Sequence, residues 1–246
     1  MENNNDIQKK IDSFLNGHKI RIKGGKIHTA EDMSILLNRI AKKEIDNGNY
    51  EKGLYFAVNA FEFNKKNLYS VFLQGLGFRF TGEYEKAIRA FKYCNSKKHD
   101  LSSFANIGFC LAELKDTDKA LDIFNNIINS ISDEEEKENS DLMALVYECM
   151  GNIYLSREDV LEFDSTDKLK INYKLAVKYY KHSLRLNKLN HMLLNKLAAC
   201  YYHFDDERKA LYCYEEAAKV APEEKNYIEA VEELRNAGVT PDVIEF

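Results

Sequence analysis

Two short stretches near the end of the chain decide the fold: Leu194-Asn-Lys-Leu197-Ala198-Ala-Cys-Tyr201, and then Ala210-Leu-Tyr-Cys-Tyr214-Glu-Glu-Ala217, followed by Pro222. In each stretch, small and large apolar residues recur at intervals of three and four, which predicts two amphipathic helices. Small residues such as Ala198 and Ala210 let two packed helices approach closely. The two stretches therefore predict a helical hairpin.

The same pattern recurs four more times upstream. The small residues of the predicted first helices are Ala41, Gly75, Gly108, Gly151 and Ala198, and those of the second helices are Gly53, Ala87, Ala120, Ala176 and Ala210. Ala41, Gly75 and Gly108 are 34 and 33 residues apart, and Ala176 and Ala210 are 34 apart. A fixed period of this length predicts an array of repeated helical hairpins.

The spacing of apolar residues, Leu-Ala pairs, tyrosines and the closing proline resembles the tetratricopeptide repeat (TPR), a helix–turn–helix unit of about 34 residues. The tryptophan often found at the first position of that motif is Leu194 in the last copy. The resemblance implies an all-α fold: a right-handed superhelical solenoid of about five TPR-like hairpins with a C-terminal capping helix. The aromatic residues of the motif are expected to fill the space between helices.

We predict three regions. Residues 1–29 form an N-terminal extension, residues 30–225 hold the repeats, and residues 226–246 form a capping helix and a tail. The predicted repeats are 34–67, 68–100, 101–133, 144–190 and 191–223.

Two insertions interrupt the period, near residues 131–141 and 157–170. The first is strongly acidic and is interpreted as a solvated loop or an extended helix end, with an acidic patch for a basic partner as the alternative. The second either lengthens the helices of the fourth repeat or forms a local flap.

The two ends of the chain leave alternatives open. Residues 6–15 predict a short helix that ends at Gly17. In the basic stretch from His18 to His28, isoleucines alternate with basic residues, which is typical of a β-hairpin with its turn at Gly24-Gly25. This stretch either packs on the first repeat or contacts an acidic partner or nucleic acid. Residues 226–236 predict the capping helix, with Gly238 at its C-terminal cap. The apolar tail after Thr240 either folds back or serves as a docking peptide.

Composition excludes several classes of protein. The 246 residues include 11 Gly, 2 Pro and 29 Phe or Tyr, which argues against both a turn-rich β fold and a disordered chain. The net charge of −5 is unlike that of a global nucleic-acid binder, and we expect neither a membrane span nor a secretory signal. Five cysteines without a C-x-x-C pair predict reduced thiols and a cytoplasmic location.

The sequence contains no catalytic motif that we recognise, and we expect neither an enzyme nor a cofactor. One cluster could in principle bind zinc: His191, Cys200 and His203, of which the last two lie three residues apart. Cys200 and His203 are better explained by packing and by solvent at the end of a helix, so no metal site is predicted.

The TPR resemblance implies that the first helix of each repeat lines a concave groove and that the groove binds peptides or partner helices. Carried over copy by copy, the groove residues are Asn38, Lys42, Tyr69, Phe72, Leu76, Arg79, Asn106, Phe109, Glu148, Asn152, Asn195 and Tyr202. Some TPR domains hold a C-terminal carboxylate with Lys and Asn pairs. In this chain, Asn38 and Lys42 stand in the reverse order of the Lys and Asn in those domains. The Lys and Arg that such domains carry on a later helix are absent from the third and fourth repeats, which argues against that clamp.

We therefore expect a non-enzymatic adaptor or scaffold that binds a peptide segment or partner helix of another protein. A membrane is not expected as a partner, and nucleic acid is disfavoured by the charge. A homo-oligomer stays possible from the sequence. Two alternatives are a regulatory or nucleic-acid-associated subunit that uses the basic segment 19–26, and an enzyme with a pocket near residues 157–170.

Overall fold

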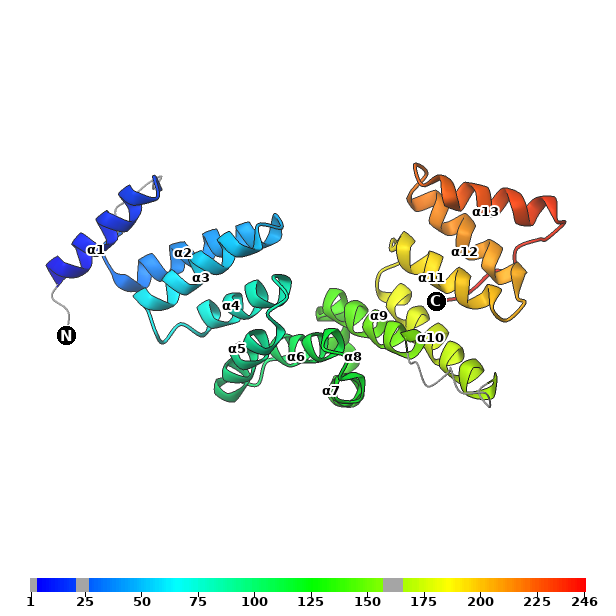
Figure 1. The fold of residues 1–246 in the computed structure, drawn as a ribbon, viewed down its shortest axis with the longest axis horizontal. Helices are drawn as coiled ribbons and strands as arrows, with labels where there is room; N and C mark the ends of the chain where they lie inside the picture. Colours follow the sequence, from blue (N-terminus) through cyan, green and yellow to red (C-terminus); the bar gives the residue numbers. More distant parts are fainter. Residues whose placement is uncertain (1–3, 21–26, 157–165) are drawn as a thin grey trace. The chain divides into compact units, whose positions relative to one another are not determined.

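In a computed structural model, residues 4–20, 27–156 and 166–246 are described, and these residues form helices joined by short turns (Figure 1). The chain divides into two compact units, Met1–Asp116 and Thr117–Phe246. The all-α class is confirmed. Each unit is described by itself below.

The first unit contains helices α1 to α6 (Figure 1). Their bounds are α1 Asn4–Gly17, α2 Ala30–Asp46, α3 Tyr50–Phe63, α4 Leu68–Phe80, α5 Tyr84–Lys97 and α6 Leu101–Glu113. Helices α2 and α3 pack as one antiparallel pair and α4 and α5 as the next, and α6 packs on α5. These pairs coincide with the first two predicted hairpins.

The second unit contains helices α7 to α13. Their bounds are α7 Thr117–Ser130, α8 Asp133–Glu138, α9 Ser140–Ser156, α10 Thr166–Leu186, α11 His191–Tyr202, α12 Glu207–Val220 and α13 Lys225–Asn236. The pairs α9 and α10, and α11 and α12, are the fourth and fifth predicted hairpins, and α13 packs on α12 as the predicted cap. None of the helices in residues 4–20, 27–156 and 166–246 combines the length and the apolar character that crossing a membrane requires.

Small residues bring the helices of a pair together, as the spacing predicts. A Cβ atom added to Gly75 of α4 would lie 2.6 Å from Cε1 of Phe91 in α5, a distance too short for two carbon atoms. The ring of Tyr180 in α10 lies against Gly151 of α9 in the same way. Phe91 and Tyr180 are both fully buried, so large rings fill the space that the glycines leave.

The turns inside the hairpins repeat one backbone feature. Gly48, Gly82, Lys115 and Asp205 each have a positive φ, between 57° and 81°, and the first three are 34 and 33 residues apart. Glycine adopts this left-handed conformation without a steric cost, which explains Gly48 and Gly82. The next helix then begins with its own cap, as at Asp206, whose carboxylate accepts a hydrogen bond from the backbone N–H of Lys209.

The acidic insertion differs from both of its predicted forms. Residues 133–138 form a separate short helix, α8, because Ser132 and Glu135 make a reciprocal capping box at its start. Glu136 fastens this helix to the unit: its carboxylate accepts hydrogen bonds from Tyr147 (2.7 Å) and Arg185 (2.7 Å). In the second insertion, residues 157–165 lie outside the described residues, and Thr166 begins the long helix α10.

Both ends of the chain pack on the repeats. Ile11 of α1 is fully buried, and the ring of Phe14 meets Phe63 of α3 edge to face. The predicted hairpin around Gly24-Gly25 lies outside the described residues. At the other end the tail folds back: Ile244 is buried with α12 and α13, and the backbone N–H of Asp242 donates to the carbonyl of Arg208 (3.0 Å).

Candidate functional site

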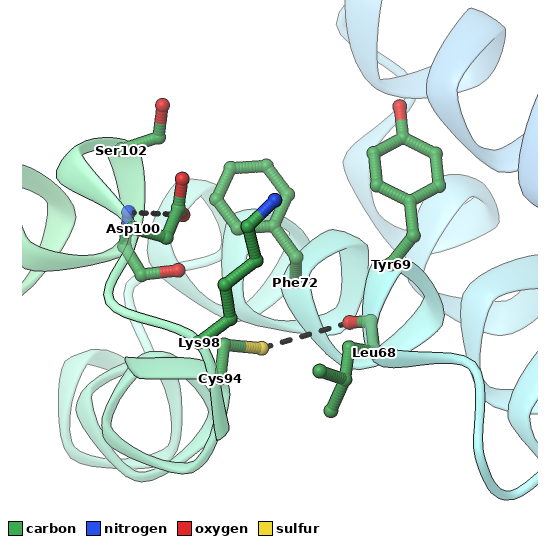
Figure 2. A pocket seen from close by; sticks show the side chains of 8 residues that line it. Leu68, Tyr69, Phe72, Cys94, Lys98, Asp100 and Ser102 are labelled. Carbon is green, nitrogen blue, oxygen red and sulfur yellow. Dashed lines mark hydrogen bonds between the residues drawn. The ribbon is translucent and has the colours of Figure 1, made fainter. Parts of the chain in front are cut away.

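A pocket of about 350 Å³ opens in the first unit where α4 begins, α5 ends and α6 begins (Figure 2). Two of its lining residues, Tyr69 and Phe72, belong to the predicted groove. The residues that line it are Leu68, Tyr69, Phe72, Cys94, Lys98, Asp100, Ser102 and Ser103.

Helix caps fix the polar rim of this pocket. The side-chain oxygen of Asn67 accepts from the backbone N–H of Tyr69 (3.1 Å) and starts α4. Asp100 starts α6 in the same way, because its carboxylate accepts from the backbone N–H of Ser103 (2.8 Å). Asp100 and Lys98 therefore lie beside one another at the mouth of the pocket (Figure 2).

Aromatic rings form the wall. The rings of Tyr69 and Phe72 stack with their centroids 6.3 Å apart and 12° between their planes. Phe72 also meets the buried Phe91 edge to face at 5.6 Å, which ties the wall to the core. Tyr69 keeps 46% of its surface exposed. The wall is thus anchored on one side and open to solvent on the other.

Two buried residues with polar side chains, Cys94 and Ser103, line the pocket. The thiol of Cys94 donates to the carbonyl of Leu68 (3.6 Å), and burial together with the nearby Asp100 raises the pKa of this thiol to about 11. Cys94 is therefore a neutral thiol near pH 7 and a poor nucleophile. The hydroxyl of Ser103 is fully buried and has no hydrogen-bond partner among the described residues. Such a group gains from a ligand that supplies a donor or acceptor.

A second hollow of about 430 Å³ lies on the other side of Tyr69. The predicted residues Asn38 and Lys42 line it, together with Arg39, Lys43, Asp46 and Asn47 of α2 and its C-terminal cap. Tyr69 lines both hollows, so it stands as a partition between them.

Arg79, Asn106 and Phe109 make an internal contact instead of an open surface. Arg79 donates to the side-chain oxygen of Asn106 (2.6 Å), and its guanidinium lies 4.7 Å from the ring centre of Phe109. Asn106 and Phe109 are only 4% and 6% exposed. The prediction that these two side chains line an accessible groove needs correction, because the long Arg79 side chain covers them. Leu76 is half-buried against the core of the first unit.

The remaining predicted residues lie in the second unit. Glu148 and Asn152 of α9 accept hydrogen bonds from the ammonium of Lys196 in α11, at 2.8 and 3.1 Å. Asn152 also accepts from the hydroxyl of Tyr180 (2.9 Å), so this cluster joins the two hairpins. Tyr202 is half exposed and Asn195 is partly buried on α11.

Sequence reasoning did not select Lys98, Asp100, Cys94 and Ser103. The role of Asp100 could be predicted from the sequence, because an Asp three residues before Ser103 at the start of a predicted helix is a capping signal. The pocket itself depends on the crossing of three helices, which the sequence pattern does not specify. In the described residues no group of three His, Cys, Asp or Glu side chains could hold a metal ion, and His203 instead packs against Tyr173.

Comparison with known proteins agrees with this geometry. The family described as Tetratricopeptide repeat matches residues 106–130. Among solved structures, PilF of Pseudomonas aeruginosa is similar with a TM-score of 0.64 and 16% identity, over 85% of this chain and 87% of that chain. A search of curated proteins finds no match to this sequence.

Two further structures are similar at the level of the fold. YrrB, described as a TPR protein with an unusual peptide-binding site, has a TM-score of 0.51 and 13% identity, over 92% of this chain and 99% of that chain. MamA of Desulfovibrio magneticus RS-1 has a TM-score of 0.55 and 14% identity, over 78% and 97%. Together with the family match at residues 106–130 and the repeated hairpins, these likenesses show that the chain has the fold of a TPR array.

Proposed function

We propose that this protein is a non-enzymatic peptide-binding adaptor, and that the pocket between α4, α5 and α6 receives an apolar anchor side chain of its partner. The observation that carries the proposal is the pocket itself: about 350 Å³, with the stacked rings of Tyr69 and Phe72 as its wall. Anchors that bury in such pockets supply most of the free energy of many protein interfaces.

The polar groups of the pocket suit a peptide better than a purely apolar ligand. The buried hydroxyl of Ser103 lacks a partner in the described part of the chain, while Lys98 is exposed at the rim. A peptide segment carries both an apolar side chain for the wall and backbone donors and acceptors for these groups. TPR proteins are typically protein interaction modules, and YrrB, which has a similar fold, is described as a TPR protein with an unusual peptide-binding site.

The chemistry of the cysteines supports a cytoplasmic adaptor. All five are free thiols, and Cys94, Cys110, Cys200 and Cys213 are buried. Burial raises the pKa of Cys110 to about 11 and that of Cys200 to about 12, so both stay protonated near neutral pH. Reduced, unreactive thiols of this kind are usual in a reducing compartment and are unsuited to covalent catalysis.

A selection with a display library of short random peptides tests the proposal. Ser102 is half-buried at the pocket and can carry a blocking side chain, so Ser102→Trp is the test variant. Ser96 of α5 is exposed outside the pocket, and Ser96→Trp is its matched control. Peptides selected on the unaltered protein should lose at least about tenfold in affinity for Ser102→Trp and keep their affinity for Ser96→Trp.

Two results would contradict the proposal. One is a failure of the library to yield any peptide that binds the folded protein. The other is equal affinity of the selected peptides for Ser102→Trp and the unaltered protein. Circular dichroism of both variants checks that the helices are intact, so that a lost affinity reports on the pocket.

A further inference from the structure

The hollow on the α2 side of Tyr69 is strongly basic. Arg39, Lys42 and Lys43 line it, and Asp46 is the one acidic residue of its lining. The carboxylate of Asp46 accepts from the ammonium of Lys42 (2.6 Å). Within the described residues, Arg39 and Lys43 make no salt bridge with a carboxylate, and both are exposed. The lining therefore carries a net positive charge that faces solvent.

Asn38 adds an independent observation in the same hollow. Its side chain is 3% exposed, and neither its amide nitrogen nor its amide oxygen has a hydrogen-bond partner among the described residues. A buried amide without partners destabilises the fold, so its retention in the wall of a hollow indicates a ligand that satisfies it. The amide nitrogen can donate to a carboxylate oxygen, which the neighbouring cations also favour.

The apolar pocket and the basic hollow share Tyr69 as a lining residue, and the two charged residues on the pocket side, Lys98 and Asp100, are of opposite sign. A single extended segment that crosses Tyr69 meets an apolar site and then a basic site. Successive residues of an extended chain advance by about 3.3 Å, so neighbouring side chains of one segment can enter both.

We propose that the partner of this groove is an acidic peptide segment: an apolar side chain enters the pocket of Phe72, and one or more Asp or Glu side chains enter the hollow of Asn38, Arg39 and Lys43. This inference rests on the proposed function and specifies the chemistry of the partner. Charge complementarity selects an acidic segment over a basic one, because a basic segment would place like charges against Arg39 and Lys43.

The peptide display selection described above also tests this inference when the selected sequences are read. Asp and Glu should be enriched at a fixed offset from an apolar residue. The double variant Arg39→Glu/Lys43→Glu should weaken these peptides by at least about tenfold. Arg89→Glu/Lys92→Glu on α5 makes the same change in net charge at two exposed positions outside both hollows, and it should leave the affinity unchanged.

The outcomes separate the two proposals. Selected peptides that depend on Ser102 but carry no excess of acidic residues, or that bind both double variants equally, overturn the acidic-partner inference and leave the pocket proposal standing. Selected peptides that are insensitive to Ser102→Trp overturn both. Acidic peptides that lose affinity for Arg39→Glu/Lys43→Glu alone, with a smaller loss at high salt because salt screens the charges, support the inference.

Discussion

Gly75 of α4 lies directly beneath the ring of Phe91 in α5, and a Cβ atom at Gly75 would come within 2.6 Å of Cε1 of that ring. Glycine in the middle of a helix costs about 1 kcal/mol relative to alanine, so its presence there requires a packing reason. The buried Phe91 supplies that reason. The ring in turn meets Phe72, so this crossing also supports the wall of the candidate pocket.

Gly75→Ala should therefore destabilise the protein although alanine favours helices. We expect a loss of about 1–3 kcal/mol in the free energy of unfolding, because the new methyl group overpacks a filled core. Gly17→Ala is the control: nothing lies within 4 Å of a Cβ atom at Gly17, so that variant should be neutral or slightly more stable. Urea denaturation followed by circular dichroism measures both. A stable Gly75→Ala protein would show that the helices can separate at no cost.

The hairpins were predictable from the sequence because their packing depends on the regular spacing of small residues and turn residues along the chain. Ala41, Gly75 and Gly108 mark helix crossings at intervals of 34 and 33 residues, and the turn residues Gly48, Gly82 and Lys115 follow the same intervals. The capping box of α8 was also readable, since Ser132 and Glu135 have the required spacing. The interpretation of that segment as a solvated loop or helix extension was wrong because it did not use this signal.

The parts that escaped prediction depend on long side chains that reach between helices. Arg79 covers Asn106 from a position 27 residues away, and Arg185 holds Glu136 across 49 residues. Each contact is set by rotamers and crossing geometry, which periodicity does not encode. The groove positions of a repeat family likewise specify a helix face, and neighbouring side chains decide whether that face is open, as at Tyr69, or closed, as at Phe109.

The folded tail allows a second prediction. Ile244 is 6% exposed and packs in the core of the second unit, whereas the adjacent Val243 is 71% exposed. Ile244→Ala should lower the free energy of unfolding by about 2 kcal/mol or more, because it removes buried methyl groups and leaves a cavity. Val243→Ala should change it by less than about 0.5 kcal/mol. Equal effects of the two substitutions would mean that the tail does not stay on α12 in solution.

The buried thiols predict a loss of stability at alkaline pH. Burial raises the pKa of both Cys94 and Cys110 to about 11, above the ordinary value of about 9 that the unfolded chain has. The folded state therefore holds these protons more tightly. Its advantage is complete below about pH 9 and is lost as the pH rises from 9 to 11. Denaturation midpoints measured from pH 7 to pH 11 check this, with Cys110→Ala as the control, which should show a shallower decline. A midpoint that is constant across the range would contradict it.

Asn38 and Asn106 provide the sharpest test of the groove, because the two side chains are equally buried but differ in their partners. Asn106 accepts from Arg79 and donates to the carbonyl of Ser102 (2.8 Å), whereas the amide of Asn38 has no partner among the described residues. Leucine has a similar size and no polar group. Asn106→Leu should thus cost about 1–3 kcal/mol of folding free energy, since it breaks a satisfied network.

Asn38→Leu should do the opposite and raise the melting temperature, because it removes a buried amide that the fold leaves unsatisfied. The same variant should lose affinity for the acidic peptides selected on the unaltered protein, because it removes a donor from the basic hollow. A gain in stability combined with a loss of binding means that Asn38 is kept for its ligand at the expense of the fold. If Asn38→Leu instead destabilises the protein as much as Asn106→Leu, the Asn38 amide serves the fold, and the basic hollow loses its main evidence for a ligand.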